Sequence, residues 1–295
     1  MNREIDLKMN FFKDWTRILK EELINYGFNL DSNNTPREIC IMYFNYKKRL
    51  INPTSREILF SKKFSCPDNS KDGLENIKKK VRNGEDLLPY LSKNINNLNY
   101  DDDMLNDWGV YHLHLGKEIK DSGFIERTGS LLFARFDNDF AYFIDVYEHG
   151  DWTKKEIVER IHDNWPTSIE DYQLKGVTGL SQKCNDNERK MFREAGLSTL
   201  IEVESGIVYA PIGGGYVTAG SSMEVLMECD RYAYKLKTYE EFIKNNIDKI
   251  ISEACESGKE INESLHFILK FEESDIIALE TNTQIRVKLD EIERN

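Results

Sequence analysis

Histidine is the residue type in this chain that most clearly suggests chemistry. Four of the five histidines, His112, His114, His149 and His162, fall within 51 consecutive positions. An imidazole can take up or release a proton near neutral pH, and its neutral form can bind a divalent metal. The sequence therefore points to two chemistries, acid–base catalysis and metal-assisted hydrolysis.

The first two histidines share one face of a predicted strand. After Trp108 the sequence alternates between apolar and polar residues, and Leu113 separates His112 from His114. A period of two is typical of a β-strand that is half buried. We therefore expect both imidazoles to project from the same side of a sheet.

A hairpin follows this strand. The apolar runs 131–137 and 140–148 flank a short Asn-Asp turn, the arrangement of two antiparallel strands. By the same period of two, Asp145, Tyr147 and His149 share a face. If that face coincides with the face of the first two histidines, imidazoles, a phenol and a carboxylate line one surface. A slip of one residue in register would separate them.

Metal-free RNA cleavage is one reaction that needs such a set. One group removes the proton of the ribose 2′-hydroxyl, and another protonates the leaving 5′-oxygen. Arg127, in the loop before the hairpin, would stabilise the charge that develops on the phosphate. This reaction requires no cofactor.

Metal-dependent hydrolysis is the alternative. His112 and His114, together with Asp145 or His149, would hold zinc or manganese, and the metal would activate water. A third interpretation is that the histidines form a hydrogen-bonded structural cluster, or the partner interface of a non-enzymatic regulatory protein. The residues alone leave all three open.

The elements around the histidines predict an α+β protein. Apolar residues at three- and four-residue steps predict helices over 11–23, 36–50 and 74–81 in the N-terminal region. Thr153, Ser221 and Thr238, each three residues before a Glu, predict helix starts by capping boxes, the first of them a helix packing on the central antiparallel sheet. A C-terminal α/β region ends in three antiparallel strands, expected at 265–271, 275–281 and 284–290.

Composition shifts suggest three parts. Residues 1–95 carry 18 Lys/Arg against 13 Asp/Glu, and the remainder carries 22 against 39. The Asn-rich stretch 94–103 resembles a linker. We expect a helical, net basic N-terminal region at 1–100, a sheet with the histidines at 104–180, and an α+β C-terminal region at 197–295.

The overall composition restricts the class of protein and the cellular compartment that we expect. A net charge of −12 disfavours a general DNA coat protein, because the chain would be repelled by phosphates. The five cysteines are scattered, which favours reduced thiols over disulfides or a structural zinc site. No apolar run has the length of a membrane span, and the first residues do not resemble a secretory signal. We expect a cytoplasmic protein without membrane contacts.

The stretch 108–152 resembles a known family. Its sequence, WGVYHLHLG…RTGSLLFARFDNDFAYFIDVYEHGDW, is similar to the sheet core of small RelE-type ribonuclease toxins, which have the barnase–EndoU–colicin–RelE-like fold. The similarity covers about 45 of the 295 residues. Such toxins are usually small and basic, whereas this chain is long, and acidic beyond residue 95.

The resemblance implies an endoribonuclease that cuts mRNA or tRNA and arrests growth, as toxin–antitoxin and antiviral defence effectors do. It implies RNA as substrate and a protein antitoxin or regulatory partner, and it leaves assembly into a homo-oligomer open. It carries the catalytic role onto His112, His114, Arg127, Tyr147 and His149.

Other motifs favour structural roles. The turn Gly213-Gly214-Gly215 could hold a phosphate before a helix, but a tight connection is the more typical use of such glycines. The tryptophans near the histidines, Trp152 among them, are expected in a core or at a domain seam rather than as base-stacking platforms. The lysine run 78–80 is typical of a solvated helix face.

Overall fold

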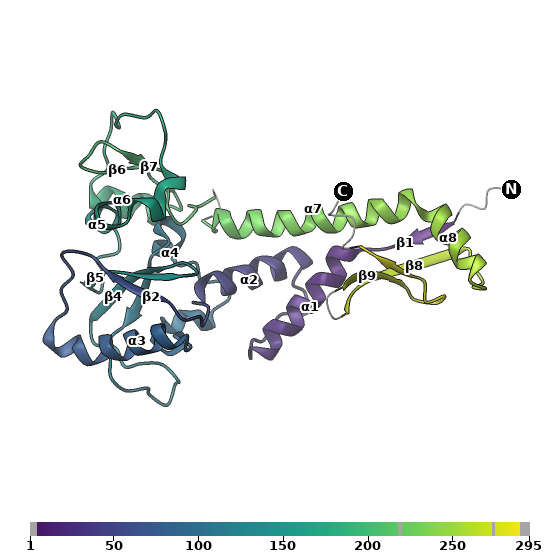
Figure 1. The fold of residues 1–295 in the computed structure, drawn as a ribbon, viewed down its shortest axis with the longest axis horizontal. Coiled ribbons are helices and arrows are strands. Elements are labelled where there is room, and N and C mark those ends of the chain that lie inside the picture. Colours follow the sequence, from purple (N-terminus) through teal and green to yellow (C-terminus); the bar gives the residue numbers. More distant parts are fainter. Residues whose placement is uncertain (1–4, 218–219, 273–274, 290–295) are drawn as a thin grey trace. The chain divides into compact units, whose positions relative to one another are not determined.

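The structure is a computed structural model that describes residues 5–217, 220–272 and 275–289 (Figure 1). It confirms an α+β protein with N-terminal helices, antiparallel sheets and C-terminal strands. The chain divides into two compact units: unit 1 comprises Met1–Phe44 and Met227–Asn295, and unit 2 comprises Asn45–Leu226.

Unit 2 contains the histidine segment. Its strands are β2 (Glu57–Phe60), β3 (Tyr111–His114), β4 (Ser130–Phe136), β5 (Phe140–Glu148), β6 (Ile201–Glu202) and β7 (Val208–Tyr209). Its helices are α3 (Lys71–Asn83), α4 (Asp103–Trp108), α5 (Glu156–Asn164) and α6 (Asp186–Glu194), with 3-10 turns at Asp68–Ser70, Leu88–Tyr90, Lys93–Asn96 and Pro166–Tyr172. The boundaries of the unit fall inside α2 (Pro36–Arg49) and α7 (Met223–Asn245).

The main sheet of unit 2 has the order β2-β5-β4-β3. The strands β3, β4 and β5 are antiparallel, as the sequence predicts, and β2 adds a parallel edge beside β5. The strand β2 was not expected, because a run of three apolar residues has no periodicity that separates a strand from a helix.

Helices cover both faces of this sheet. On one face, α3 contributes Leu74, Ile77 and Val81 to a core with the inner residues of β3, β4 and β5. On the other face, α4 and α5 form a second core that includes Trp108 and Ile161. The histidine-bearing side of β3 belongs to this second face, because the β4 residues paired with its histidines lie in that core.

The predicted hairpin is present. The Asp137 carboxylate accepts hydrogen bonds from the backbone N–H groups of Asp139 and Phe140, at 2.9 and 2.7 Å, and thereby closes the turn. The register between β4 and β5 then shifts between Phe133 and Ala134, where Ile144 is the extra residue of a β-bulge.

The helix expected after Ser221 is present, since α7 begins at Met223, but the capping boxes predicted at Thr153 and Thr238 do not form. The helix α5 begins at Glu156, and its N-cap is Lys155, which makes no side-chain cap hydrogen bond. Thr238 lies in the middle of α7, where its hydroxyl donates to the carbonyl of Tyr234 at 3.1 Å. A Thr that satisfies its hydroxyl on the preceding turn has no need to end the helix.

Unit 1 is built from both ends of the chain. Its sheet has the order β1-β8-β9-β10, with β1 (Asp6–Lys8) parallel to β8 (Ser264–Glu272), and with β9 (Asp275–Glu280) and β10 (Arg286–Lys288) antiparallel. Its helices are α1 (Phe11–Asn25), α8 (Ile247–Glu256) and the adjoining parts of α2 and α7. The three expected C-terminal strands match β8, β9 and β10, except that residue 290 lies outside the described residues. Residues 1–4 of the expected N-terminal region also lie outside the described residues.

The two units differ from the three predicted parts. The expected boundary at 94–103 lies within unit 2, because this stretch is bonded to α2. The Asn45 amide donates to the carbonyls of Leu98 and Tyr100, and the Arg49 guanidinium donates to that of Asn94. Its Asn-rich composition therefore reflects a bonded loop and not a linker.

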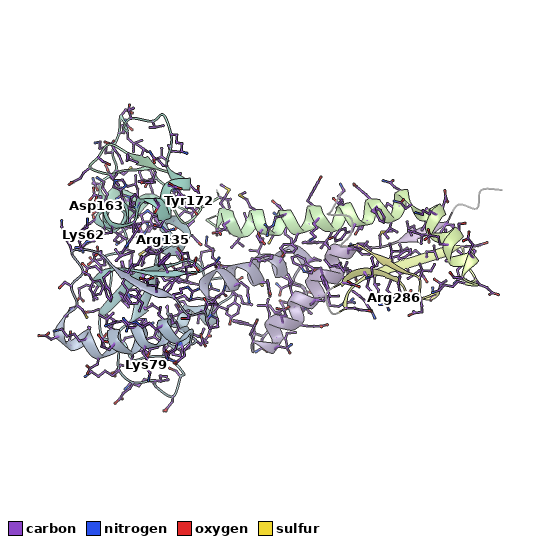
Figure 2. All side chains as sticks on the ribbon, viewed as in Figure 1. Lys62, Lys79, Arg135, Asp163, Tyr172 and Arg286 are labelled. Carbon is purple, nitrogen blue, oxygen red and sulfur yellow. The ribbon has the colours of Figure 1, made fainter. Side chains whose placement is uncertain are left out.

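Three smaller expectations concern the lysine run, membrane spans and the cysteines. The lysine run on α3 is solvated: Lys78 pairs with Glu75, Lys80 pairs with Glu85, and Lys79 is exposed (Figure 2). None of the helices among residues 5–217, 220–272 and 275–289 combines the length and the apolar character needed to cross a bilayer. All five cysteines are free thiols.

Candidate functional site

A cleft of about 440 Å³ opens in unit 2 beside the edge strand β3. Its lining comes from the loop before α4, from β3, from the loops on either side of the hairpin and from α6. The lining residues are Ser92, Asn94, Tyr100, Asp102, Asp103, Met104, His112, Arg127, His149, Trp152, Thr153, Lys190, Arg193 and Glu194.

Two of the predicted histidines meet in this cleft around one indole. The ring centroid of His112 lies 4.9 Å from that of Trp152, and the centroid of His149 lies 5.0 Å from it. The two imidazole centroids are therefore within about 10 Å of each other, by the sum of those distances. This upper limit is short enough for both rings to approach one nucleotide-sized ligand.

Trp152 is held in place by the sheet. Its ring stacks on Phe133 of β4, with 5.5 Å between centroids and 13° between planes. Because Phe133 pairs directly with His112 across β3 and β4, the indole lies against the same face of the sheet as the imidazole. The tryptophan is thus anchored in the core, as expected, but it also lines the cleft, which the sequence interpretation did not foresee.

Asp102 stands beside His112. Its Oδ1 caps α4 by accepting from the backbone N–H of Leu105 at 3.0 Å, and its Oδ2 lies 3.7 Å from Nδ1 of the imidazole. Both side chains are largely buried, at 14% and 13% exposure. The helix cap therefore places a carboxylate next to the ring.

The triple-glycine turn fixes α4. The backbone N–H groups of Gly213 and Gly215 donate to the carbonyls of Asp107 and Asn106, at 2.9 and 2.8 Å. A Cβ at Gly213 would lie 2.3 Å from the carbonyl oxygen of Leu105. The turn is a close backbone contact and not a phosphate cradle, since its N–H groups are already bonded.

Two exposed cationic side chains also line the cleft. Arg127 is exposed and forms no ion pair with any residue in the described part of the chain. Lys190, on α6, is exposed as well, and its nearest carboxylate, that of Glu194, is 4.0 Å away. Both groups can contact an anionic ligand.

His114 is not among the residues that line the cleft. Its side chain is buried, and its Nδ1 has no hydrogen-bond partner among the described residues. Burial, together with the nearby His112, Arg127 and His149, lowers its pKa to about 4. The ring is therefore neutral at pH 7 and does not reach a ligand in the cleft.

Tyr147 and Asp145 are also kept away from the cleft. The Tyr147 ring is buried against Phe133, with 4.8 Å between centroids, and burial raises the pKa of its phenol. The Asp145 carboxylate pairs with the Arg160 guanidinium at 2.6 Å. The cleft therefore contains three of the five catalytic candidates, His112, Arg127 and His149, and lacks Tyr147 and His114.

The donor set of the metal alternative is not assembled. The Asp145 carboxylate is ion-paired with Arg160, and His114 is buried and does not line the cleft. Within residues 5–217, 220–272 and 275–289, no three His, Cys, Asp or Glu side chains are arranged to hold a metal ion.

His162, the last of the four clustered histidines, does not line this cleft. Its Nδ1 is 2.8 Å from the hydroxyl of Tyr209, and its Nε2 is 3.3 Å from that of Ser205. It serves a local hydrogen-bond network.

Comparison with known proteins identifies no relative. Neither the protein-family models, nor the curated proteins, nor the solved structures contain a match to this chain. The function of the cleft must therefore be argued from its geometry.

Sequence reasoning missed several cleft residues. Asp102 belongs to the Asn- and Asp-rich stretch that resembled a linker, although an Asp just before an apolar run is also a typical helix cap. Arg193 lies on α6, a helix whose arginines are buried while its Met191 and Phe192 are exposed. No pattern within this sequence predicts a helix whose arginines are buried and whose large apolar side chains are exposed.

Proposed function

We propose that this protein is an endoribonuclease-like effector of the cytosol that cleaves RNA without a metal, by acid–base chemistry at His112 and His149. The observation that carries the proposal is the placement of the two imidazoles on one indole, in a cleft that also contains Arg127. An imidazole pair suits both proton transfers because its ordinary pKa is near neutrality.

The size and charge of the cleft support a nucleotide-sized ligand. A volume of about 440 Å³ is within the range of small-ligand sites. Arg127 and Lys190 offer exposed cations to phosphate groups, and the guanidinium of Arg127 can bind two phosphate oxygens at once.

The reaction follows from these groups. The neutral imidazole removes the proton of a ribose 2′-hydroxyl, and the 2′-oxygen forms a bond to the adjacent phosphorus. The bond from phosphorus to the 5′-oxygen breaks, and the protonated imidazole donates its proton to that oxygen. The products are a 2′,3′-cyclic phosphate and a 5′-hydroxyl. Each proton transfer contributes about 10²- to 10⁴-fold to the rate.

The similarity of 108–152 to RelE-type ribonuclease toxins agrees with this proposal. It extends the proposal to cleavage of mRNA or tRNA in growth arrest or antiviral defence, with a protein antitoxin or regulatory partner. The assignment differs from the one that the similarity implies, because it uses His112, Arg127 and His149 and gives Tyr147 no catalytic role.

The test is cleavage of an end-labelled oligoribonucleotide by the full chain, with and without EDTA. We expect cleavage in both conditions, products that end in a cyclic phosphate, and no cleavage where the scissile ribose carries a 2′-deoxy substitution. His112→Ala and His149→Ala should each lower the rate by about 10²-fold or more.

The control variant is His266→Ala, since His266 is an exposed histidine of β8 in unit 1. It should cleave like the native protein. Native activity in both His112→Ala and His149→Ala, with unchanged thermal melts, would refute the proposal.

A further inference from the structure

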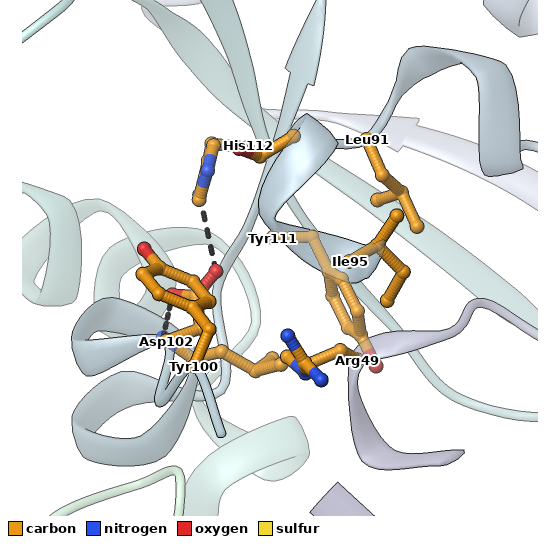
Figure 3. A pocket seen from close by; sticks show the side chains of 9 residues that line it. Arg49, Leu91, Ile95, Tyr100, Asp102, Tyr111 and His112 are labelled. Carbon is orange, nitrogen blue, oxygen red and sulfur yellow. Dashed lines mark hydrogen bonds and ion pairs between the residues drawn. The ribbon is translucent and has the colours of Figure 1, made fainter. Parts of the chain in front are cut away.

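A second, much smaller cavity lies directly behind His112. It has a volume of about 20 Å³ and is lined by Arg49, Tyr100, Asp102 and His112, among others (Figure 3). A cavity that can hold a water needs about 10–15 Å³ by the same measure, together with several polar neighbours. This one therefore has room for a single water molecule.

Two polar atoms with no protein partner belong to residues that line this cavity. Nδ1 of His112 and Nη2 of Arg49 are both buried, and neither has a hydrogen-bond partner among the described residues. Buried polar atoms of this kind are costly unless they are bonded. A water in this cavity that bonds both Nδ1 of His112 and the Asp102 carboxylate would join the two across the 3.7 Å that separates them.

The surroundings hold Arg49 and Asp102 in place independently of that water. The Arg49 Nε and Nη1 atoms donate to the carbonyls of Asn45 and Asn94, at 3.1 and 2.9 Å. Asp102 is fixed by its cap on Leu105, so its second oxygen remains directed toward the imidazole. The carboxylate and the guanidinium are thus positioned before any ligand enters the cleft.

The two histidines of the cleft differ in whether a carboxylate lies beside the imidazole. His149 is exposed, and no carboxylate lies within ion-pair distance of it in the described part of the chain. His112 alone has a buried carboxylate at 3.7 Å. An imidazole with a carboxylate beside Nδ1 keeps its proton on that nitrogen and leaves Nε2 free to accept another.

We propose that Asp102 is a positioning residue that fixes His112 in the tautomer with Nδ1 protonated, through the charge of its carboxylate 3.7 Å away and through one water in the small cavity. This inference rests on the proposed function and assigns its two roles. His112 is then the base that takes the 2′-hydroxyl proton on Nε2, and the imidazolium so formed is stabilised by Asp102. His149 is the acid that protonates the 5′-oxygen.

The experiment measures the tautomer of His112 and the cleavage of RNA separately. Imidazole ¹⁵N chemical shifts of the full chain distinguish a protonated Nδ1 from a protonated Nε2. In the native protein we expect the signature of protonated Nδ1 at His112. In Asp102→Ser that signature should be lost, because serine retains a helix cap but is too short to reach the ring.

Asp102→Asn is the second variant, and it retains both the cap and the shape of the side chain. It should lower kcat by about 10- to 100-fold, the effect of removing the carboxylate partner of a functional imidazole, with little change in KM. Asp86→Asn is the matched control, since Asp86 also bonds a nearby backbone N–H, that of Leu88, but does not line the cleft.

The outcomes separate this inference from the proposed function. If native protein cleaves RNA but the His112 tautomer is the same in Asp102→Ser, the positioning role is refuted and the ribonuclease remains. If the tautomer changes but native protein cleaves no RNA, the positioning role is supported and the ribonuclease is refuted.

Discussion

The Arg193 guanidinium and the Asp107 carboxylate form an ion pair at 2.8 Å, in which the side chains are only 4% and 2% exposed. The guanidinium also lies over the ring of Trp108, with 4.4 Å to the centroid, and donates to the carbonyl of Trp152. One side chain of α6 thereby joins α4 to the backbone of the indole that both imidazoles contact. The ion pair thus links two helices, α4 and α6, that both contribute residues to the cleft.

Breaking this pair should destabilise unit 2. Arg193→Met leaves the Asp107 charge buried without its partner, and we expect a loss of about 3–5 kcal/mol in the free energy of unfolding. Chemical denaturation of the full chain, followed by circular dichroism, measures it. Lys190→Met, an exposed change on the same helix, should stay within about 0.5 kcal/mol.

Removing both charges provides the second half of this test. The double variant Asp107→Asn with Arg193→Met no longer buries an unpaired charge, so it should regain part of the stability lost in the single variant. A double variant as unstable as the sum of the two single variants would show that the pair is not coupled.

His114 should make the stability depend on pH. Its pKa is about 4 in the folded protein because the ring is buried, against about 6.5 in an unfolded chain. Between those values the unfolded chain binds a proton that the folded protein does not, so stability falls as pH decreases from about 6.5 to about 4. At pH 4.5 the expected loss is about 2–3 kcal/mol relative to pH 7.

A non-titrating replacement isolates this effect. The stability difference between native protein and His114→Gln, measured at pH 7 and at pH 4.5, should decrease by the same amount. The comparison is needed because Asp103 acts in the opposite direction. Burial and neighbouring carboxylates raise its pKa to about 6, which favours the folded state as pH falls from 6 to 3.8. A difference that is independent of pH would contradict the assignment.

Arg127 should contribute one phosphate contact. For an RNA made uncleavable by a 2′-deoxy substitution, Arg127→Ala should weaken binding and reduce the slope of log K against log salt by about 0.7. Arg127→Lys should retain the slope, since it keeps the charge, but should lower the cleavage rate because a lysine cannot bind two phosphate oxygens in parallel.

The control for this series is Lys120→Ala. Lys120 is an exposed cation of the same connecting region, but it is already paired with Glu118 and Glu126. Its removal should leave both the slope and the rate unchanged. A native salt slope in Arg127→Ala would show that the guanidinium does not contact the RNA.

The alternation of residues was sufficient to predict the sheet around the histidines. His112 pairs with Phe133, and Phe133 pairs with Asp145, so these three residues share a face, as the period of two requires. Residues that share a face of the sheet do not all line the cleft. Neighbouring strands are about 4.8 Å apart, so a residue of β5 lies about 10 Å from a residue of β3. This spacing explains why Asp145 and Tyr147 do not reach the cleft.

His149 reaches the cleft because it lies beyond the end of β5. Its backbone N–H bonds the carbonyl of Gly129, and Gly150, with φ of 113°, turns the chain so that Trp152 returns over the sheet. Asp102 and Arg193 come from segments distant in sequence, and their places depend on tertiary packing. Periodicity within one segment contains no information about such contacts.

The division of the chain has a consequence for its biosynthesis. Unit 2 is continuous, whereas β1 near the N-terminus pairs with β8, more than 250 residues later. At about 5–20 residues per second, the ribosome needs several more seconds to add the segment Met227–Asn295 after unit 2 is complete. We therefore expect the nascent chain to present a finished cleft while the N-terminal strand still lacks its neighbour. A messenger truncated after α7 would encode that cleft without the sheet of unit 1.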